Sequence, residues 1–390
     1  MLKEATAVVI GGGCMGASIA YNLAKMGEEN VLLVERTHIA WGATGRSTAI
    51  VRQHYSNEVT ARMALEGLKF FQSFERETGL PTGFRQTGFV LVANDAQAEG
   101  LRQNVDMQKG LGIKTRLLNP AELRSLQPEA NVKDVSIAAY EEDSGYADPV
   151  ETTRSLAEAA RKLGVDLIEG TTVTGVKVAS GKVTAVETSA GTIKTDKVVN
   201  AGNVWANKVL ENLGITLPIT AVREQNCQFM RPAGFRSPIP VWGDLIQAIY
   251  FRPQGADRIV VGSLETDLPT IADPDLMQEG VDYSTVQSFA AKLMMRFPSM
   301  SDGSWERGWS GPYDVTPDWH PILDEWPKVE GLYIAAGFSG HGFKLCSPVG
   351  RMMASLIREG KKPPGMEIFN AKRFDEGKLI QARYEQKIIS

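Results

Sequence analysis

The chain has 390 residues, of which 43% are hydrophobic and 23% are charged, and this length favours two domains. Its formal net charge is −4 and no basic block stands out, which argues against nucleic acid as a partner. Four histidines and three widely spaced cysteines predict neither a metal site nor a disulfide framework. We expect no signal peptide and no membrane span, so the cytoplasm is the expected location.

The first elements are predicted from "TAVVIGGGCMGASIAYNLAKMGEENVLLVER", which begins at Thr6. "AVVI" predicts a short buried strand, "ASIAYNLAKMG" a helix that ends at Gly27, and "VLLVE" a second strand. The turn between the first strand and the helix carries the pattern G-x-G-x-x-G at Gly11, Gly13 and Gly16. Glu35 closes the second strand about 20 positions later, where a ribose-binding acid is expected.

Each part of this turn suits a dinucleotide. Gly11 permits the tight turn, Gly13 lets the backbone approach a pyrophosphate, and Gly16 lets the helix pack closely on the strand. The helix N-terminus offers unpaired N–H groups and a positive dipole end, and Glu35 accepts hydrogen bonds from ribose hydroxyls. The pattern alone leaves NAD, FAD and simple helix–strand packing as alternatives.

Short strands are expected further along at "VDLIEG" and "KVVNAGNVWA", the second of which ends in a small-residue turn. Near the other end of the chain, "LYIAA" predicts a strand that a glycine-rich turn joins to an amphipathic helix from about Lys344 to Ile357. Two glycine-rich turns, each between a strand and a helix, suit a ligand held by both ends of the chain. We therefore expect the first domain to be discontinuous.

A second sheet is predicted by four further stretches with turn signals between them. These are "GFVLVAN", "QNCQFMRP", "QAIYFRPQ" and "RIVVGSLE".

Taken together, several segments resemble the D-amino-acid-oxidase superfamily of FAD enzymes. They are the glycine turn with "VLLVER", "GATGRSTAIVR", "NAGNVWA", "GPYDVTPDWHPILD" and "GFSGHGFKLCSPVG", and they cover nearly the whole chain in order. Within the superfamily the chain looks most like the beta subunit of heterotetrameric sarcosine oxidase and its single-chain relatives. The resemblance selects FAD as the dinucleotide, with its adenosine end on Gly11 to Glu35.

The resemblance also implies an α/β (α+β) architecture of two domains. A Rossmann-type FAD-binding domain with a parallel sheet would comprise residues 1–85, 145–220 and 325–390. A substrate domain built on a mixed, largely antiparallel sheet would comprise residues 86–144 and 221–324. The substrate would then lie between that sheet and the flavin ring.

The implied reaction is oxidation of the C–N bond of a small secondary amino acid, N-methyl or cyclic, such as sarcosine. A hydride equivalent passes to flavin N5, and the resulting imine hydrolyses. By resemblance, Arg52 and Lys344 anchor the substrate carboxylate and Tyr250 lines the pocket, while His341 is a candidate acid–base group. Arg223 and Arg252 are weaker candidates for the carboxylate. We expect these residues to contact FAD: Gly11, Gly13, Cys14, Met15, Gly16, Glu35, Arg36, Gly45, Arg46, Ser47, Val173, Ala201, Gly202, Trp205, Gly311, Gly337, Gly340, His341, Gly342, Phe343 and Lys344.

The sequence also departs from the family pattern. Gly311 stands where monomeric sarcosine oxidases tether FAD through cysteine, so we expect non-covalent FAD. Val260 stands where those enzymes carry a lysine that promotes reaction with oxygen, which leaves oxygen or another electron acceptor open. Gly311 and Pro312, with Arg307 nearby, disfavour a primary D-amino acid. No histidine lies between His54 and His320, so a second flavin held covalently on such a residue is not expected.

Three alternatives stay open. The chain could be a catalytic subunit of a larger dehydrogenase that passes electrons to partner cofactors, or it could form a homo-oligomer. It could bind flavin without catalysis of its own, although Arg52 and Lys344 argue against a mere scaffold. An NAD dehydrogenase is the third alternative, and it predicts a colourless protein.

Overall fold

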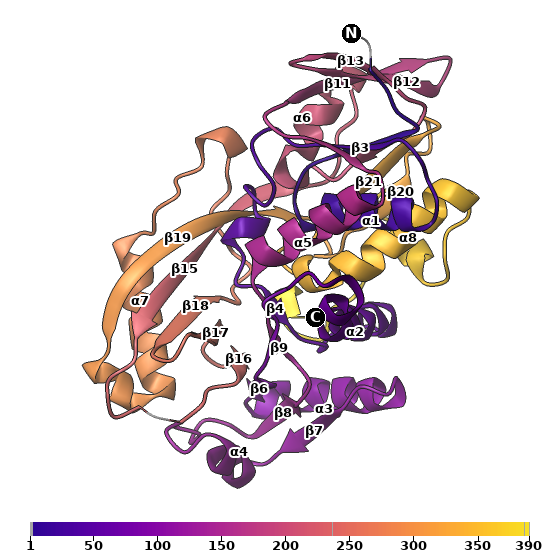
Figure 1. Cartoon of the computed structure of the whole chain (residues 1–390). Helices are drawn as coiled ribbons and strands as arrows, with labels where there is room; N and C mark the ends of the chain where they lie inside the picture. Colours follow the sequence, from indigo (N-terminus) through magenta and orange to yellow (C-terminus); the bar gives the residue numbers. More distant parts are fainter. Residues whose placement is uncertain (1–2, 236, 386, 390) are drawn as a thin grey trace.

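The computed structural model describes residues 3–235, 237–385 and 387–389. It contains two large sheets, one of six strands and one of eight, and two smaller sheets of four and three strands. Figure 1 shows the eight-stranded sheet as a curved layer whose long strands, β15 (Thr220–Met230) and β19 (Ser304–Val315), lead back to the part of the molecule that contains the six-stranded sheet.

The six-stranded sheet is parallel except at one edge, where the last strand pairs antiparallel with its neighbour. The strands predicted at "AVVI", "VLLVE" and "LYIAA" are confirmed here, and all three are fully buried, as strands covered on both faces are. In spatial order the strands are β10 (Asp166–Ile168), β3 (Val31–Val34), β2 (Ala7–Ile10), β14 (Val198–Asn200), β21 (Leu332–Ala336) and β20 (Ile322–Glu325).

Helices cover one face of this sheet and a smaller sheet covers the other. Val9 and Leu33 pack among the helices α1 (Cys14–Lys25), α2 (Glu58–Thr78), α5 (Pro149–Lys162) and α8 (Cys346–Glu359). The helix expected from about Lys344 to Ile357 is α8, which begins two residues later because Phe343–Leu345 forms a 3-10 turn. The opposite face packs on α6 (Ala206–Leu210) and on the four-stranded sheet of β1 (Lys3–Glu4), β13 (Gly191–Lys194), β12 (Lys182–Thr188) and β11 (Val173–Ala179).

The eight-stranded sheet is antiparallel except where β6 and β16 run parallel, so the predicted mixed sheet is confirmed. One of its faces packs on α4 (Pro120–Leu126) and α7 (Tyr283–Arg296), and the other packs on α3 (Asp95–Gly110). In spatial order the strands are β19, β15, β18 (Arg258–Ser263), β17 (Ile249–Gln254), β16 (Val241–Asp244), β6 (Phe89–Ala93), β8 (Ile137–Glu141) and β7 (Thr115–Leu118).

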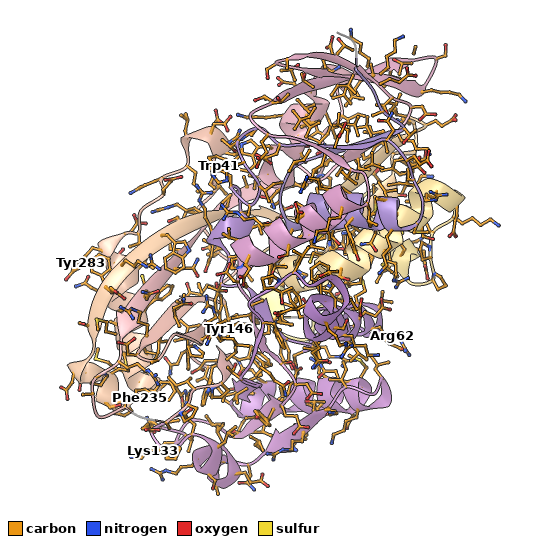
Figure 2. The ribbon with its side chains drawn as sticks, in the orientation of Figure 1. Trp41, Arg62, Lys133, Tyr146, Phe235 and Tyr283 are labelled. Carbon is orange, nitrogen blue, oxygen red and sulfur yellow. The ribbon has the colours of Figure 1, made fainter. Side chains whose placement is uncertain are left out.

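A short three-stranded sheet lies where the chain passes between the two large sheets. Its strands are β4 (Ile50–Val51), β9 (Gly145–Tyr146) and β5 (Arg85–Gln86). Tyr146 is seen near the middle of the molecule, and Arg52 follows β4 directly (Figure 2). Two of the expected domain boundaries, at residues 85 and 145, lie within this sheet. The expected boundary before residue 325 instead falls inside β20, which joins the six-stranded sheet from Ile322 onward.

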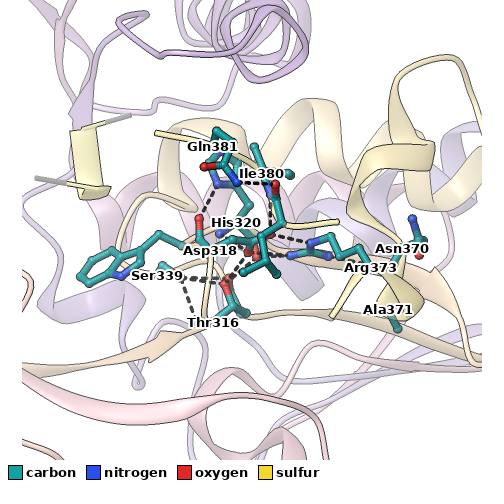
Figure 3. Close-up of polar contacts among 12 residues, drawn as sticks. Thr316, Asp318, His320, Ser339, Asn370, Ala371, Arg373, Ile380 and Gln381 are labelled. Atoms are coloured by element: carbon teal, nitrogen blue, oxygen red, sulfur yellow. Dashed lines mark hydrogen bonds and ion pairs between the residues drawn. The ribbon is translucent and has the colours of Figure 1, made fainter. Parts of the chain in front are cut away.

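The C-terminal segment is tied to the turn after β19 through Asp318 and Arg373 (Figure 3). Arg373 donates from Nε to one carboxylate oxygen of Asp318 at 2.8 Å and from Nη2 to the other at 3.0 Å. Asp318 also accepts from the backbone N–H groups of His320 and Ile380. Asp318 therefore satisfies one backbone donor in its own turn and one in the C-terminal segment. Among the described residues, no helix is both long and apolar enough to cross a lipid bilayer.

Candidate cofactor cleft and active site

The turn between β2 and α1 requires glycine for steric reasons. Gly11 has φ +108°, and a Cβ there would lie 2.6 Å from the carbonyl oxygen of Ala201. A Cβ at Gly16 would lie 1.9 Å from the carbonyl oxygen of Gly11, a distance that no side chain tolerates. These contacts bring β2, β14 and the first turn of α1 together and leave the backbone exposed to a ligand from the open side.

The N-terminus of α1 is open to an anion. Gly13 is its N-cap, so no side chain caps the helix, and no acidic residue lies in its first turn. The backbone N–H of Cys14 donates to Thr44 Oγ1 at 3.2 Å. The positive end of the helix dipole and its remaining N–H groups therefore face the space beyond the turn, as a bound pyrophosphate requires.

Glu35 lies at the end of β3 beside this turn. Its Oε2 accepts from the backbone N–H of Gly12 at 2.7 Å, and its Oε1 accepts from the backbone N–H of Thr37 at 2.8 Å. These bonds fix the carboxylate, which also lines the adjoining cleft. Oε1 also accepts from Thr37 Oγ1 at 3.0 Å, so Oε2 is the oxygen that retains a lone pair for a ribose hydroxyl.

One cleft joins both glycine-rich turns, and it encloses about 1340 Å³ of space including its open mouth. It brings together fourteen of the residues expected to contact FAD: Gly11, Gly13, Cys14, Met15, Glu35, Arg36, Ser47, Val173, Ala201, Gly202, Trp205, Gly340, Gly342 and Phe343. The other residues of that set, which are not among its lining, are Gly16, Gly45, Arg46, Gly311, Gly337, His341 and Lys344.

The seven expected residues that do not line the cleft lie close to residues that do. Gly16 packs on Gly11, and Gly337 donates its N–H to Asp314 at 2.6 Å, which holds the turn after β21. Asp314 itself lines the cleft, and burial raises its pKa to about 6. Gly45 and Arg46 line a second, more polar cavity with Arg252 and Arg307, and Ser47 is a wall common to both.

The cleft also has walls that the sequence did not reveal. The Arg36 guanidinium lies between two tryptophan rings, 4.7 Å from the Trp41 centroid and 4.2 Å from the Trp205 centroid. Asp275, from the segment after β18, accepts from Arg36, Lys208 and the Trp205 indole N–H. The segment after β18 carries no local sequence pattern that would have placed Asp275 at the cleft.

Three of the four predicted catalytic residues gather around Tyr55. The Arg52 guanidinium lies 4.4 Å from the Tyr55 ring centroid, and the Lys344 ammonium lies 6.0 Å from it. The Tyr55 hydroxyl approaches Nδ1 of His341 at 3.4 Å. The side chains of this group are buried, and it adjoins the Gly340–Phe343 end of the cleft.

Burial lowers the pKa of both cations of this group. Burial lowers the pKa of Lys344 well below its ordinary value, and the neighbouring Arg52 charge lowers it further. Burial also lowers the pKa of Arg52, although Tyr55 and Glu141 partly oppose this. Lys344 donates to the carbonyl oxygen of His341 at 3.1 Å. An anion placed beside both cations would favour their charged forms.

The ring of His341 is fixed in one tautomer. Its Nε2–H donates to the carbonyl oxygen of Trp319 at 2.6 Å, so Nδ1 is the acceptor side that faces Tyr55. Burial and the Lys344 charge lower the pKa of His341 well below its ordinary value. His341 is therefore neutral at physiological pH.

Tyr250, the fourth predicted catalytic residue, belongs to a different group. Its hydroxyl donates to Asn226 Oδ1 at 3.1 Å and lies in hydrogen-bonding range of Thr48 and Tyr313. Tyr313 lines the cleft, and its ring would be 2.4 Å from a Cβ at Gly340. Gly340 is therefore close to the Tyr250 group through Tyr313, and His341 is close to the Arg52 group through Tyr55, at one end of the cleft.

The family model for DAO, described as FAD dependent oxidoreductase, matches residues 6–356. The chain belongs to the DAO family. The family is one of FAD-dependent oxidoreductases, as the resemblance predicted, and the Rossmann-type sheet and the mixed second sheet agree with the fold that the resemblance implied.

Known proteins of this family align along almost the whole chain. Mouse mitochondrial sarcosine dehydrogenase is 30% identical over 98% of this chain, and the alignment covers 42% of that protein. Sarcosine oxidase subunit beta of Rhodobacter capsulatus is 28% identical over 97% of this chain and 90% of its own length. The crystal structure of L-proline dehydrogenase from P. horikoshii superposes with a TM-score of 0.89, at 29% identity, over 97% of this chain and 100% of that one. The chain spans less than half the length of the curated mitochondrial relatives.

The cleft of this DAO protein fits the cofactor of its family. The crowded glycines at one end leave no room for side chains, and the open N-terminus of α1 suits a pyrophosphate. At the other end, the Gly340–Phe343 turn precedes α8 and adjoins the buried cations. Gly11, Gly13 and Glu35 would hold the adenosine half of FAD, and Gly340, Gly342 and Phe343 would face the flavin half.

Proposed function

We propose that this chain oxidises the C–N bond of a small secondary amino acid, N-methyl or cyclic, with non-covalent FAD as the cofactor. The proposal depends chiefly on one observation, the placement of the buried cations Arg52 and Lys344 around Tyr55 beside the cleft. Relatives named for sarcosine and L-proline are consistent with this class of substrate.

A substrate carboxylate is the anion that suits this group best. Two cations held close together at 5% exposure each raise the free energy of the folded protein, because burial removes their hydration. A carboxylate placed beside both would reduce the repulsion between them, and arginine is well suited to carboxylate recognition. We infer that Arg52 and Lys344 hold the substrate by its carboxylate.

Apolar and aromatic side chains enclose the proposed substrate site. Tyr55, Tyr250 and Phe343 are buried around the same end of the cleft, which excludes water from the reacting carbon. When bound, FAD supplies the two-electron acceptor for this reaction. Backbone N–H groups of the Gly340–Phe343 turn and the Lys344 side chain would favour the negative charge of the reduced cofactor. The oxidised amine is an imine, which water hydrolyses after release.

We infer that residues 1–85, 145–220 and 325–390 form the FAD-binding domain, and that residues 86–144 and 221–324 form the substrate domain. Gly311 offers no thiol for a covalent link, which supports the proposal that FAD is dissociable. Acid precipitation should leave the yellow flavin in the supernatant. Flavin retained in the pellet would contradict non-covalent binding.

The first experiment is the visible absorption spectrum of the purified protein, recorded anaerobically before and after addition of secondary amino acids. Sarcosine, L-proline and N-methylated amino acids form the panel. Bleaching of the flavin bands by one of them supports the proposed reaction. Substitutions Arg52→Met and Lys344→Met should reduce the rate of bleaching, whereas Lys361→Met, an exposed lysine after α8, should not.

A second reading follows from the relative named as a sarcosine oxidase subunit. A chain of this kind would pass electrons to cofactors on partner subunits, and the apolar Val260, where an oxygen-promoting lysine was expected, is consistent with a slow reaction with oxygen. Bleaching by substrate without rapid recolouring in air would favour this reading. Rapid recolouring, with one peroxide formed per turnover, would favour a self-sufficient oxidase.

A further inference from the structure

Glu224 is a buried acid that has no role in the proposed reaction as described above. It lies on β15 with 1% of its surface exposed. Its Oε1 accepts from the backbone N–H of Ser263 at 2.9 Å, whereas its Oε2 is buried and has no hydrogen-bond partner among the described residues. A buried carboxyl oxygen without a hydrogen-bond partner is unfavourable, so a ligand that donates a hydrogen bond to Oε2 would be stabilised here.

Glu224 faces the active-site side of the eight-stranded sheet. Side chains alternate along a strand, so Glu224 and Asn226 share one face of β15, and Cys227 points to the other. Cys227 packs in the core beneath α7, and Asn226 accepts from the Tyr250 hydroxyl. Glu224 is close enough to Tyr250 and Tyr313 to raise the pKa of both phenols.

Among the described residues, the titratable groups that interact electrostatically with Glu224 are neutral or acidic. They are the phenols of Tyr250 on β17 and Tyr313 on β19, the thiol of Cys227 on the opposite face of its own strand, and the Glu265 carboxylate after β18. Burial raises the pKa of Glu224 to about 8, and the Glu265 charge adds to this effect. A cationic donor would reverse both effects, because it would favour the carboxylate.

We propose that Glu224 binds the protonated amine of the substrate through Oε2 and accepts one of its protons. This rests on the proposed function. The ammonium N–H bond breaks, an O–H bond forms on the Glu224 carboxylate, and the products are a neutral secondary amine and a neutral carboxyl. Only the neutral amine has the nitrogen lone pair that assists loss of hydride from the adjacent carbon.

The arrangement of charges supports this role. Arg52 and Lys344 lie around Tyr55, which approaches His341. Glu224 lies near Tyr250 and Tyr313, whose ring packs at Gly340. A zwitterionic amino acid carries its carboxylate and its ammonium on the same carbon. An anion-binding group and a cation-binding group beside two consecutive residues, Gly340 and His341, match those two charges.

The test measures ligand binding to the FAD-loaded enzyme through the change in flavin absorbance. Acetate probes the carboxylate-binding group alone, and dimethylammonium chloride probes the amine-binding group alone. In the wild type, dimethylammonium should bind more tightly as the pH rises toward 8. Glu224→Gln should weaken its binding by about tenfold or more and leave acetate binding unchanged. Glu224→Asp, which keeps the charge, should retain part of the affinity.

Glu77→Gln is the matched control, since Glu77 is an exposed acid on α2. It should bind both probes like the wild type. Equal dimethylammonium binding by the wild type and Glu224→Gln would overturn the inference, and so would a wild type that does not bind this ion. These binding results do not depend on turnover. If dimethylammonium binds through Glu224 but no amino acid bleaches the flavin, the proposed function fails and the amine site stands.

Discussion

The side chains of Asp318 and Arg373 form an ion pair at 2.8 Å in which each side chain is only 1% exposed. The pair joins the turn after β19 to the segment that follows α8 (Figure 3). Arg373→Met should destabilise the fold by about 3–5 kcal/mol, because it leaves the Asp318 carboxylate buried without its partner. Chemical denaturation monitored by far-UV circular dichroism measures this loss.

The double variant Asp318→Asn with Arg373→Met should lose less stability than Arg373→Met alone, since neither charge then remains. Lys378→Met is the control, because Lys378 pairs with Glu376 at the surface. Its effect should stay below about 1 kcal/mol. A loss in Arg373→Met no larger than that of the control would show that the pair contributes little to stability.

Gly16→Ala should abolish tight FAD binding, since its Cβ would meet the carbonyl oxygen of Gly11 at 1.9 Å and push α1 away from β2. Gly110→Ala is a matched control, because a Cβ at this end of α3 meets nothing within 4 Å. Fluorescence titration of the apoproteins with FAD compares their affinities. Wild-type affinity in Gly16→Ala would disprove the close packing at this turn.

The segment 264–282 crosses to the ribose end of the cleft, where Asp275 accepts from Arg36 and Lys208. Asp275→Asn should speed FAD dissociation about fivefold, because each partly exposed ion pair contributes at most about 1 kcal/mol. Release of FAD into a large dilution, followed by flavin fluorescence, gives the rate constant. Raising the ionic strength should speed release from the wild type and have little effect on the variant.

Asp267→Asn is the control for this segment, because Asp267 is exposed and lies before the part that reaches the cleft. Its rate of FAD release should equal that of the wild type. If Asp275→Asn also releases FAD at the wild-type rate, the segment does not retain the cofactor.

Glu224 should make stability depend on pH. Its pKa in the folded chain is about 8, above the ordinary value of 4.5, so folding favours the protonated form. The stability that this group contributes is fully present below pH 4.5 and is lost as the pH rises through 8. Glu224→Gln removes this dependence, and its melting temperature relative to the wild type should therefore rise between pH 5 and pH 8, the interval that these two pKa values define.

Thermal melts of the apoproteins at several pH values provide this comparison, with Glu77→Gln, at an exposed acid on α2, as the control. The apoprotein is used because ligands that bind the folded state would add their own pH dependence. A constant difference in melting temperature between the wild type and Glu224→Gln would show that Glu224 titrates near its ordinary value in the folded chain.

The sequence predicts best those parts of the fold that local patterns specify. The strands at "AVVI" and "VLLVE", the glycine turn and the helix before Gly27 follow each other within one stretch, and the structure confirms them. The C-terminal helix is shifted by two residues, because its first turn is a 3-10 turn whose pattern resembles that of an α-helix.

Contacts between segments that are distant in the sequence could not be predicted from local patterns. Asp318 has the sequence context of a turn residue, and nothing near it indicates Arg373 as a partner. Glu224 is an acid within a stretch of strand, where alternation suggests an exposed side. Only its contacts with Ser263, Tyr250 and Tyr313 show that this face is covered. Tyr55 lies in the stretch "AIVRQHY", but its place between Arg52, Lys344 and His341 depends on the return of the chain after β21.

The cleft also constrains how the protein acquires its cofactor during synthesis. The strands β2 and β3 leave the ribosome early, but β14 pairs with β21 on its other edge, and the Gly340–Phe343 wall follows β21. The sheet therefore stays incomplete, with an open strand edge, until β21 has emerged. The cleft can enclose FAD only once β21 and the Gly340–Phe343 turn have joined β2 and β14.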